Sequence, residues 1–184
     1  MTDQVICAIS EVFERWVRYQ QQRGIEIQCS EQELRPSPCC CGKADKVRWK
    51  PVLREGMSNL NNIAQALDCE FHPDIHAYYG AAFAGEMHFS FKGLEVALVQ
   101  AWNDDAFERL QENLVAHILM LRKLKLPITL FLATVRDETR VISLDNESGQ
   151  VILEQLGKPK RWILAHSLTE FLQRLSPLPY RQND

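Results

Sequence analysis

The sequence lacks the features that mark membrane-spanning and secreted proteins. Its longest nearly apolar run, residues 114–121, is interrupted by His117. That run is far shorter than the roughly 20 apolar residues that a spanning helix needs. The first residues, Met1 to Gln4, contain no basic start followed by an apolar stretch, so they do not resemble a secretory signal. We therefore expect the chain to stay in the cytoplasm.

The sequence also lacks an excess of basic residues. Its 184 residues include 21 Lys and Arg against 24 Asp and Glu, which gives a formal net charge of −3. Domains that bind nucleic acid are usually basic because they neutralise phosphates. The charge therefore argues against a nucleic-acid ligand. A chain of this length normally forms one domain, and no repeat or linker divides it, so we expect a single domain over residues 1–184.

Short motifs that mark common catalytic sites are missing as well. There is no G-x-S-x-G, no P-loop and no G-x-G-x-x-G. His72 and His76 are four residues apart, but Pro73 takes the place of the glutamate that a zincin helix carries there. We expect no metal, no cofactor and no catalytic residue. His117 lies among apolar neighbours and is expected to be a hydrogen-bonded core residue.

Three of the six cysteines form the consecutive run Cys39–Cys41. Paired zinc ligands are normally spaced as C-x2-4-C, so that two sulfurs can reach one ion, and a second pair is missing here. We therefore prefer an ordinary loop to a metal site. Two enzymatic alternatives are a thiol enzyme that uses Cys39 with a distant histidine and a hydrolase that uses a pair of acids.

Hydrophobic periodicity predicts an α+β fold with a mainly antiparallel central sheet and flanking helices. Helices are expected over 3–22, 59–67, 73–80, 104–124 and 168–175. Strands are expected at 47–49 and 128–134, with hairpins that pair 86–91 with 94–99 and 139–144 with 150–155.

Several details of this fold also follow from the pattern. Ser58 and Ser167 are candidate helix caps, and residues 25–45 are expected to form a loop. The helix over 104–124 is apolar nearly all round in its middle, so we expect it to be the central buried helix. Prolines at 177 and 179 are expected to end the ordered chain.

Acidic residues are concentrated between residues 68 and 112. Only Lys92 and Arg109 oppose them there, so the segment has a local charge of −7. If its helices and its hairpin adjoin in space, the acids form one negative surface that speeds the encounter with a basic partner. Scattered solvated acids are the simpler interpretation. The acids are Asp68, Glu70, Asp74, Glu86, Glu95, Asp104, Asp105, Glu108 and Glu112.

Five stretches taken together resemble a known family. They are Pro36-Ser37-Pro38-Cys39, FAGEMH at 83–88, the long run at 100–134, VISLDNESG at 141–149 and LTEFLQRL at 168–175. In this order they resemble the Syd family of SecY-interacting proteins from gamma-proteobacteria, which is similar to the broader Smi1/Knr4-type α+β domains.

The resemblance implies a non-enzymatic protein at the cytoplasmic side of the inner membrane, held there peripherally by its partner. That partner is SecY, the channel subunit of the protein translocase, and the implied role is to sense or restrain improperly assembled translocase. An acidic surface is implied to meet basic cytosolic loops of SecY. A module of the immunity type with a soluble basic partner is the alternative. The contacts that we expect are Asp74, Tyr78, Tyr79, Glu86, Trp102, Asp104, Asp105, Glu108 and Glu112.

Overall fold

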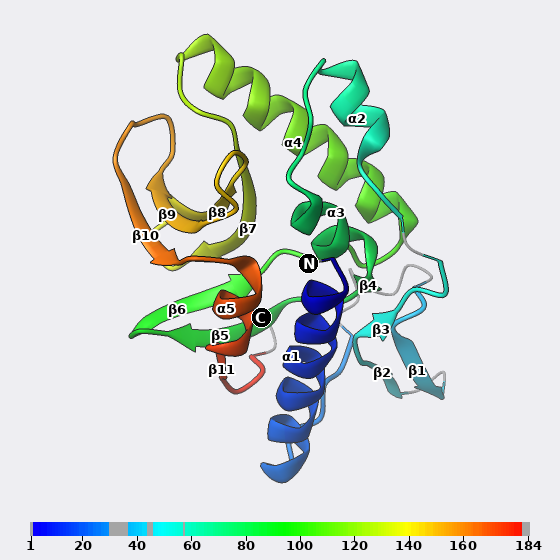
Figure 1. Ribbon diagram of the computed structural model, residues 1–184. Coiled ribbons are helices and arrows are strands. Elements are labelled where there is room, and N and C mark those ends of the chain that lie inside the picture. Colours follow the sequence, from blue (N-terminus) through cyan, green and yellow to red (C-terminus); the bar gives the residue numbers. More distant parts are fainter. Residues whose placement is uncertain (1, 30–36, 44–45, 57, 182–184) are drawn as a thin grey trace.

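A curled antiparallel sheet organises the fold. The computed structural model describes residues 2–29, 37–43, 46–56 and 58–181. Seven strands follow the order β10-β9-β8-β7-β6-β5-β11, and helices lie around them (Figure 1). The predicted α+β class is confirmed. The strands are β5 (Met87–Phe91), β6 (Leu94–Leu98), β7 (Thr129–Val135), β8 (Arg140–Asp145), β9 (Val151–Gln155), β10 (Arg161–Ala165) and β11 (Ser176–Pro177).

Both predicted hairpins are confirmed. The first pairs β5 with β6 across Lys92 and Gly93, which have φ angles of 47° and 84°. Glycine adopts this left-handed conformation without steric cost. The second pairs β8 with β9, and β7 joins the two hairpins in the same sheet. Strands β10 and β11, which the periodicity did not indicate, extend the sheet at its two edges.

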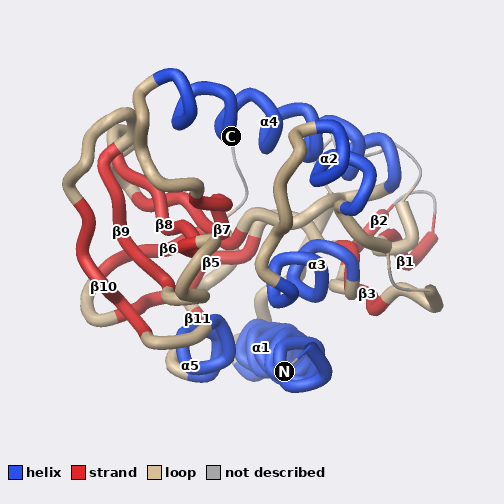
Figure 2. The backbone as a smooth tube through the Cα atoms, turned by 45° about the horizontal axis from the view of Figure 1, so that its top comes forward, coloured by secondary structure: helices blue, strands red, loops and turns tan. Residues whose placement is uncertain are grey.

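Helix α1 (Thr2–Gln22) packs against α3 (Pro73–Gly80) and α5 (Leu168–Gln173). Its apolar stripe is almost inaccessible, with Val5, Val12 and Trp16 at 0% exposure. Burying such a stripe against other elements is what stabilises a helix of this kind. Figure 2 shows α1 and α5 at one end of the molecule, with α3 beside α1. Ser167 caps α5 by accepting the N–H of Glu170, as predicted.

Helix α4 (Asp104–Lys123) is not the central buried helix that we expected. One face is buried, and it packs against β7. On the other face Leu119 is 51% exposed. The apolar middle of the sequence suggested full burial, but single exposed apolar residues are common on protein surfaces. Helix α2 (Asn61–Ala66) lies beside α4, far from α1 (Figures 1 and 2).

Residues 25–45 contain more structure than the expected loop. Strand β1 (Cys40–Lys43) pairs antiparallel with β2 (Lys46–Trp49), the strand that we predicted. A second small sheet pairs β3 (Val52–Leu53) with β4 (Ala82–Phe83). The cap of α2 was also predicted wrongly. Asn59 Oδ1, not the side chain of Ser58, accepts the N–H of Asn61 at 3.0 Å.

The chain remains ordered beyond Pro177, contrary to expectation. Pro177 belongs to β11, which pairs with β5. Gln20 of α1 is fully buried, and its side-chain amide holds the segment that follows. The amide N–H donates to the carbonyl of Leu178 at 2.8 Å, and its oxygen accepts the N–H of Tyr180 at 2.9 Å. Two complementary hydrogen bonds satisfy this buried amide, as burial of a polar group requires.

His117 is a hydrogen-bonded, half-buried residue of the core, as predicted. Its Nε2 atom lies 3.1 Å from the hydroxyl of Thr129, which donates to Glu154 at 2.7 Å. Arg161 completes the cluster, with its Nε atom 3.5 Å from Glu154. Burial lowers the pKa of His117. Burial therefore favours the neutral form of His117, and the contact with the Thr129 hydroxyl satisfies its ring.

Candidate protein-binding surfaces

Four aromatic side chains from distant parts of the chain meet beside α1. Trp16 stacks on Trp49 at 5.5 Å, and Trp102 meets Trp49 edge-on at 5.7 Å. Tyr180 closes the group at 6.1 Å from both Trp16 and Trp49. We call Trp16, Trp49, Trp102 and Tyr180 the aromatic cluster. Trp102 was predicted to contact a partner, but here it is half-buried and packs within the protein.

The most recognisable short motifs of the sequence support this cluster. Ser37 donates its hydroxyl to the carbonyl of Trp102 and accepts the N–H of Cys39 at 3.1 Å. Gly85 lies against the ring of Trp49, so close that an added Cβ would be 2.8 Å from Cζ2 of the ring. Real side chains do not tolerate such a contact. These motif residues therefore have a structural role.

Cys39 has the wrong environment for a nucleophile. Its side chain is 1% exposed, and burial raises the pKa of its thiol to about 11. Reactive cysteines are instead exposed thiolates with a lowered pKa. Cys40 points elsewhere, with its sulfur 3.9 Å from that of Cys29. Within the described residues, no group of three or more Cys, His, Asp or Glu is arranged to hold a metal ion.

Tyr78 and Tyr79 lie in the core, so the structure removes them from the predicted contact surface. Both are 0% exposed, and their hydroxyls donate to the carbonyls of Leu132 and Phe131 in β7. The sequence pattern placed them on a short helix among acids and gave no sign of burial on all sides. Asp74 of the same helix has only 6% exposure and faces α1 and α5.

The first turns of α4 carry the predicted acids that are most accessible. Asp104 is 80% exposed and pairs with Arg54 at 2.7 Å, so a positive charge already balances it. Asp105, Glu108 and Glu112 are exposed and form no ion pair with the described residues. Their spacing of three and four places them on one stripe of the helix. We call Asp105, Glu108 and Glu112 the α4 acidic stripe.

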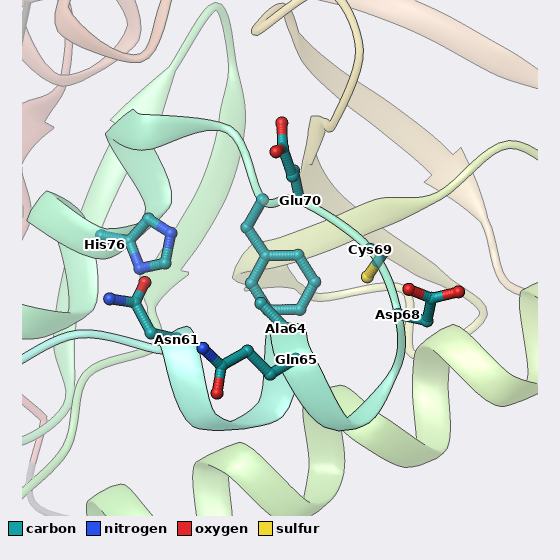
Figure 3. Close-up of a pocket in the computed structure, with 8 residues that line it drawn as sticks. Asn61, Ala64, Gln65, Asp68, Cys69, Glu70 and His76 are labelled. Carbon is teal, nitrogen blue, oxygen red and sulfur yellow. The ribbon is translucent and has the colours of Figure 1, made fainter.

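A groove of about 620 Å³ lies on the other side of α2 (Figure 3). Phe71 lies among the side chains that line it, and Asn61, Gln65 and His76 carry polar groups. The groove also includes Asp68 and Glu70, so we call it the α2 groove. His76 Nδ1 accepts the N–H of Leu60 at 3.0 Å, and burial lowers the pKa of His76. A neutral ring bonded in this way keeps its N–H on Nε2, and that atom remains a possible donor.

The α2 groove and the α4 acidic stripe flank the same short helix. Asn62 of α2 donates to Gln111 of α4 at 2.8 Å, so the two helices are in contact. Asn61, Gln65 and Asp68 line the groove on the opposite flank of α2. Acids from both ends of segment 68–112 therefore lie on the two flanks of α2, and Arg122, which donates to the carbonyl of Leu67, lies beside the acids of the groove.

Glu86 belongs to a separate region with mixed charge. It lies 3.3 Å from His88, on the open face of β5 and β6. The neighbouring Glu95 pairs with Arg136 at 2.8 Å and with Arg181 at 3.0 Å. Cations therefore balance the acids of this sheet face. The nine acids of the segment do not form one continuous patch.

A second groove gathers acids from three helices. It is a groove of about 470 Å³ between α1, α3 and α5, and we call it the α1–α3–α5 groove. Asp3 and Glu11 come from α1, Asp74 from α3 and Glu170 from α5. Only Asp74 falls within segment 68–112. Asp3 and Glu11 share α1, whereas Glu170 comes from the opposite end of the chain, so local charge counting could not reveal that these acids lie close together.

Comparisons with known proteins decide the family. The family described as Syd protein (SUKH-2) matches residues 6–177. The chain belongs to the Syd family. It is 69% identical to Protein Syd of Tolumonas auensis over 178 residues, which are 97% of this chain and 92% of that protein. It is also 41% identical to Protein Syd of Pectobacterium carotovorum, over 97% of this chain and 99% of that one.

Membership in the Syd family agrees with the resemblance seen in the sequence. A further relative, Protein Syd of Aliivibrio salmonicida, is 39% identical over 93% of this chain and 95% of its own. Among the described residues, no helix is both long and apolar enough to cross a bilayer. The Syd motifs quoted above mark the fold and its aromatic cluster, while the acidic grooves are built mostly from other positions.

Proposed function

We propose that this protein binds SecY at the cytoplasmic face of the inner membrane through an acidic surface, and that it acts by binding and not by catalysis. Membership in the Syd family carries the proposal, because the resemblance implies SecY as the partner. Cytosolic loops of membrane proteins are rich in Lys and Arg. An acidic surface is the electrostatic complement of such loops. Through this contact the protein would sense or restrain improperly assembled translocase.

The surface around α2 supports this proposal. The α4 acidic stripe is exposed, and Asp68 and Glu70 border the groove on the opposite flank of α2. Negative charges that lie close together attract a basic segment over long range and reject acidic competitors. Leu119, seven residues after Glu112, is exposed and offers an apolar contact farther along α4. The surface therefore combines charge for attraction with an apolar group for contact.

Salt is the first test of the proposal. Raising the ionic strength from about 0.1 M to about 1 M shortens the screening length from about 10 Å to about 3 Å. We expect binding to SecY-containing vesicles, measured by co-sedimentation, to weaken steeply over that range. Binding that is indifferent to salt would contradict an acidic contact surface. Capture of a soluble basic protein in place of SecY would favour the immunity-type alternative.

Charge reversal on α4 is the second test. We expect Glu108→Lys combined with Glu112→Lys to weaken binding to SecY vesicles by about tenfold or more, because like charges across an interface repel. Both positions are exposed, and both lie beyond the first turn, so the helix start keeps its acids. The matched control is Glu14→Lys with Glu138→Lys, which changes the net charge equally at exposed sites away from α4. Equal losses of binding in the two double variants would show that binding depends on net charge alone and not on the position of the acids.

A further inference from the structure

The far end of α4 carries lysines that no ion pair neutralises. Lys123 belongs to the last turn, and Lys125 follows the helix with a φ of 55°. Both are exposed, and neither forms an ion pair with the described residues. Cations stabilise the carboxyl end of a helix, but this effect is confined to the last turn. The helix therefore explains Lys123 and leaves Lys125 without a structural role.

The turn between β9 and β10 brings two more lysines to the same place. Lys158 and Lys160 are exposed and form no ion pair within the described part of the chain. The turn lies against the end of α4, because a Cβ added at Gly157 would be 3.6 Å from Cδ1 of Leu124. Figure 2 shows both segments at the same end of the molecule. Four lysines from two distant segments therefore gather there.

Exposed apolar side chains lie among these lysines. The described chain exposes six large apolar residues, and four of them belong to this end. The ring of Trp162 also has Nζ of Lys160 at 4.8 Å from its centre. We call residues 123–125 and 156–163 the basic–apolar end. Its exposed apolar residues are Leu124 at 46%, Leu156 at 45%, Trp162 at 38% and Ile163 at 56%.

Acids do not cancel the charge of the basic–apolar end, which contains no Asp or Glu. Glu154 lies 3.5 Å from Arg161, so these two charges balance each other. In the β7–β8 turn, Asp137 pairs with Arg140 at 2.7 Å. Glu138 of that turn is a single exposed acid against the four lysines. The excess of positive charge therefore calls for an anionic partner.

The mixture of lysine with exposed apolar residues favours a bilayer as that partner. Nucleic acid offers its phosphates to lysine, but its backbone has no counterpart for leucine and isoleucine. A bilayer offers both anionic headgroups and an apolar layer beneath them, and tryptophan prefers this interface. Lysine can bury its methylene groups there while its charge stays at the headgroups. Clusters of about 4–8 basic residues are typical of proteins that bind anionic lipid.

We propose that the basic–apolar end docks directly on anionic phospholipids. The inference goes beyond the proposed function, because this contact needs no SecY. The α4 acidic stripe does not oppose it, since Asp105 and Lys123 are about 27 Å apart along the helix. Lipid would meet the lysines while the acids stay turned toward another partner.

The test uses the full-length protein with vesicles that contain no SecY. We expect it to co-float with vesicles of phosphatidylcholine and phosphatidylglycerol, but not with phosphatidylcholine alone. One lysine near an anionic leaflet changes partitioning by about fivefold, so Lys158→Gln with Lys160→Gln should weaken binding by about tenfold or more. The control, Arg18→Gln with Lys50→Gln, removes the same charge at exposed positions beside α1. It should change binding by less than about twofold, because charges far from the contact are screened.

Brominated lipid locates the contact, because bromine on the acyl chains quenches only tryptophans that reach the bilayer. Trp16 and Trp49 are buried, whereas Trp162 is exposed. We expect quenching in the bound protein that Trp162→Phe largely removes. Quenching that is unchanged in this variant would place another surface on the lipid and overturn the inference.

Three binding results would also overturn it. Vesicles with and without phosphatidylglycerol could bind equally well. The two double variants could lose equal affinity, which would reduce the effect to net charge. Polyglutamate could bind as tightly as the anionic vesicles, which would make an acidic protein the partner. If Lys158→Gln with Lys160→Gln fails to fold, Lys123→Gln with Lys125→Gln replaces it under the same expectations.

SecY in vesicles of phosphatidylcholine alone separates this inference from the proposed function. We expect Lys158→Gln with Lys160→Gln to bind such vesicles as the original protein does, because its acids are intact. If the original protein ignores them but binds anionic vesicles, the proposed function fails and the lipid contact stands. If it binds them but ignores SecY-free anionic vesicles, only the lipid contact fails.

Discussion

The aromatic cluster and the α1–α3–α5 groove both bury polar atoms that have no hydrogen-bond partner among the described residues, yet the consequences differ. In the cluster these atoms are the Nε1 groups of Trp16 and Trp49, which are neutral. Each unpaired group costs about 1–3 kcal/mol, which the packing of two large rings offsets. In the groove the atom is Oδ1 of Asp74, which is itself buried although the residue lines the groove. The first site is closed and structural, and the second has room for a ligand.

The comparison also shows that some residues of the family's motifs have a structural role and not a binding role. Ser37 and Gly85 belong to the motifs by which the Syd family is recognised, and both support the aromatic cluster. Asp3 and Glu11 belong to no quoted motif, yet they line the groove. A memorable sequence motif can therefore mark a packing constraint and not a binding site.

Removing Trp49 should have the largest effect on the closed region. Trp49 is 2% exposed and contacts the other three rings of the cluster. We expect Trp49→Ala to lower the free energy of unfolding by about 3–5 kcal/mol, the usual cost of truncating a buried aromatic residue. Urea denaturation measures this change in the free energy of unfolding. Trp162, which is 38% exposed on β10, is the matched control, and its alanine variant should lose less than about 1 kcal/mol. Similar losses at both positions would contradict the central role of the cluster.

A smaller change, Gly85→Ala, tests how tightly the cluster is closed. The added methyl group would overlap the ring of Trp49, so we expect the free energy of unfolding to fall by about 1–3 kcal/mol. Gly56→Ala is the control, because an added Cβ there meets nothing within 4 Å. Thermal or urea unfolding of the two variants gives the comparison. If both alanines are tolerated equally, the ring of Trp49 has more freedom than the structure shows.

Acidification tests a third buried polar site, the one around His117, in which hydrogen bonds satisfy the histidine. Burial lowers the pKa of His117 in the folded protein, whereas the unfolded chain regains the ordinary value of 6.5. Below that value the unfolded state binds more protons, so stability that is fully present at higher pH is lost as the pH falls. We expect the melting temperature to drop between about pH 7 and pH 5.

The variant His117→Gln should show a shallower drop in that range, because it keeps a donor but cannot titrate. His166→Gln at an exposed position is the control and should retain the original slope. His76 has a pKa that burial also lowers, so part of the slope should survive in the His117 variant. An unchanged slope of melting temperature against pH in His117→Gln would show that groups other than His117 cause the pH dependence of stability.

Much of the fold followed from the sequence because its signals are local. Alternation in residues 86–99, helped by Lys92-Gly93, is enough to define a hairpin, and the stripe of α1 is clear by spacing alone. The short strands β3, β4 and β11 have only two residues each, which is too short for any period to appear. Strand β10 combines Arg161 with apolar neighbours that remain exposed, so neither alternation nor burial marks it.

The candidate site was less predictable because it depends on tertiary packing. Charge counting correctly found the exposed acids Glu108 and Glu112, which belong to one helix. Tyr78 and Tyr79 were selected because aromatic residues often contribute strongly to interfaces, and their burial in a short, mostly buried helix could not be read from the local sequence. The grouping of Asp3 and Glu11 with Asp74 arises only when α1 packs against α3, a contact that no sequence spacing expresses.

The two hydrogen bonds between the Gln20 side chain and the segment around Leu178 have a consequence for folding during synthesis. These two residues are separated by 158 positions, so the ribosome produces α1 long before the segment that completes its environment. Helix α3 can cover part of α1 early, but α5 and Tyr180 arrive much later. Until then the unpaired amide and part of the apolar stripe remain exposed to water. The nascent chain must therefore be kept from aggregating during most of its synthesis.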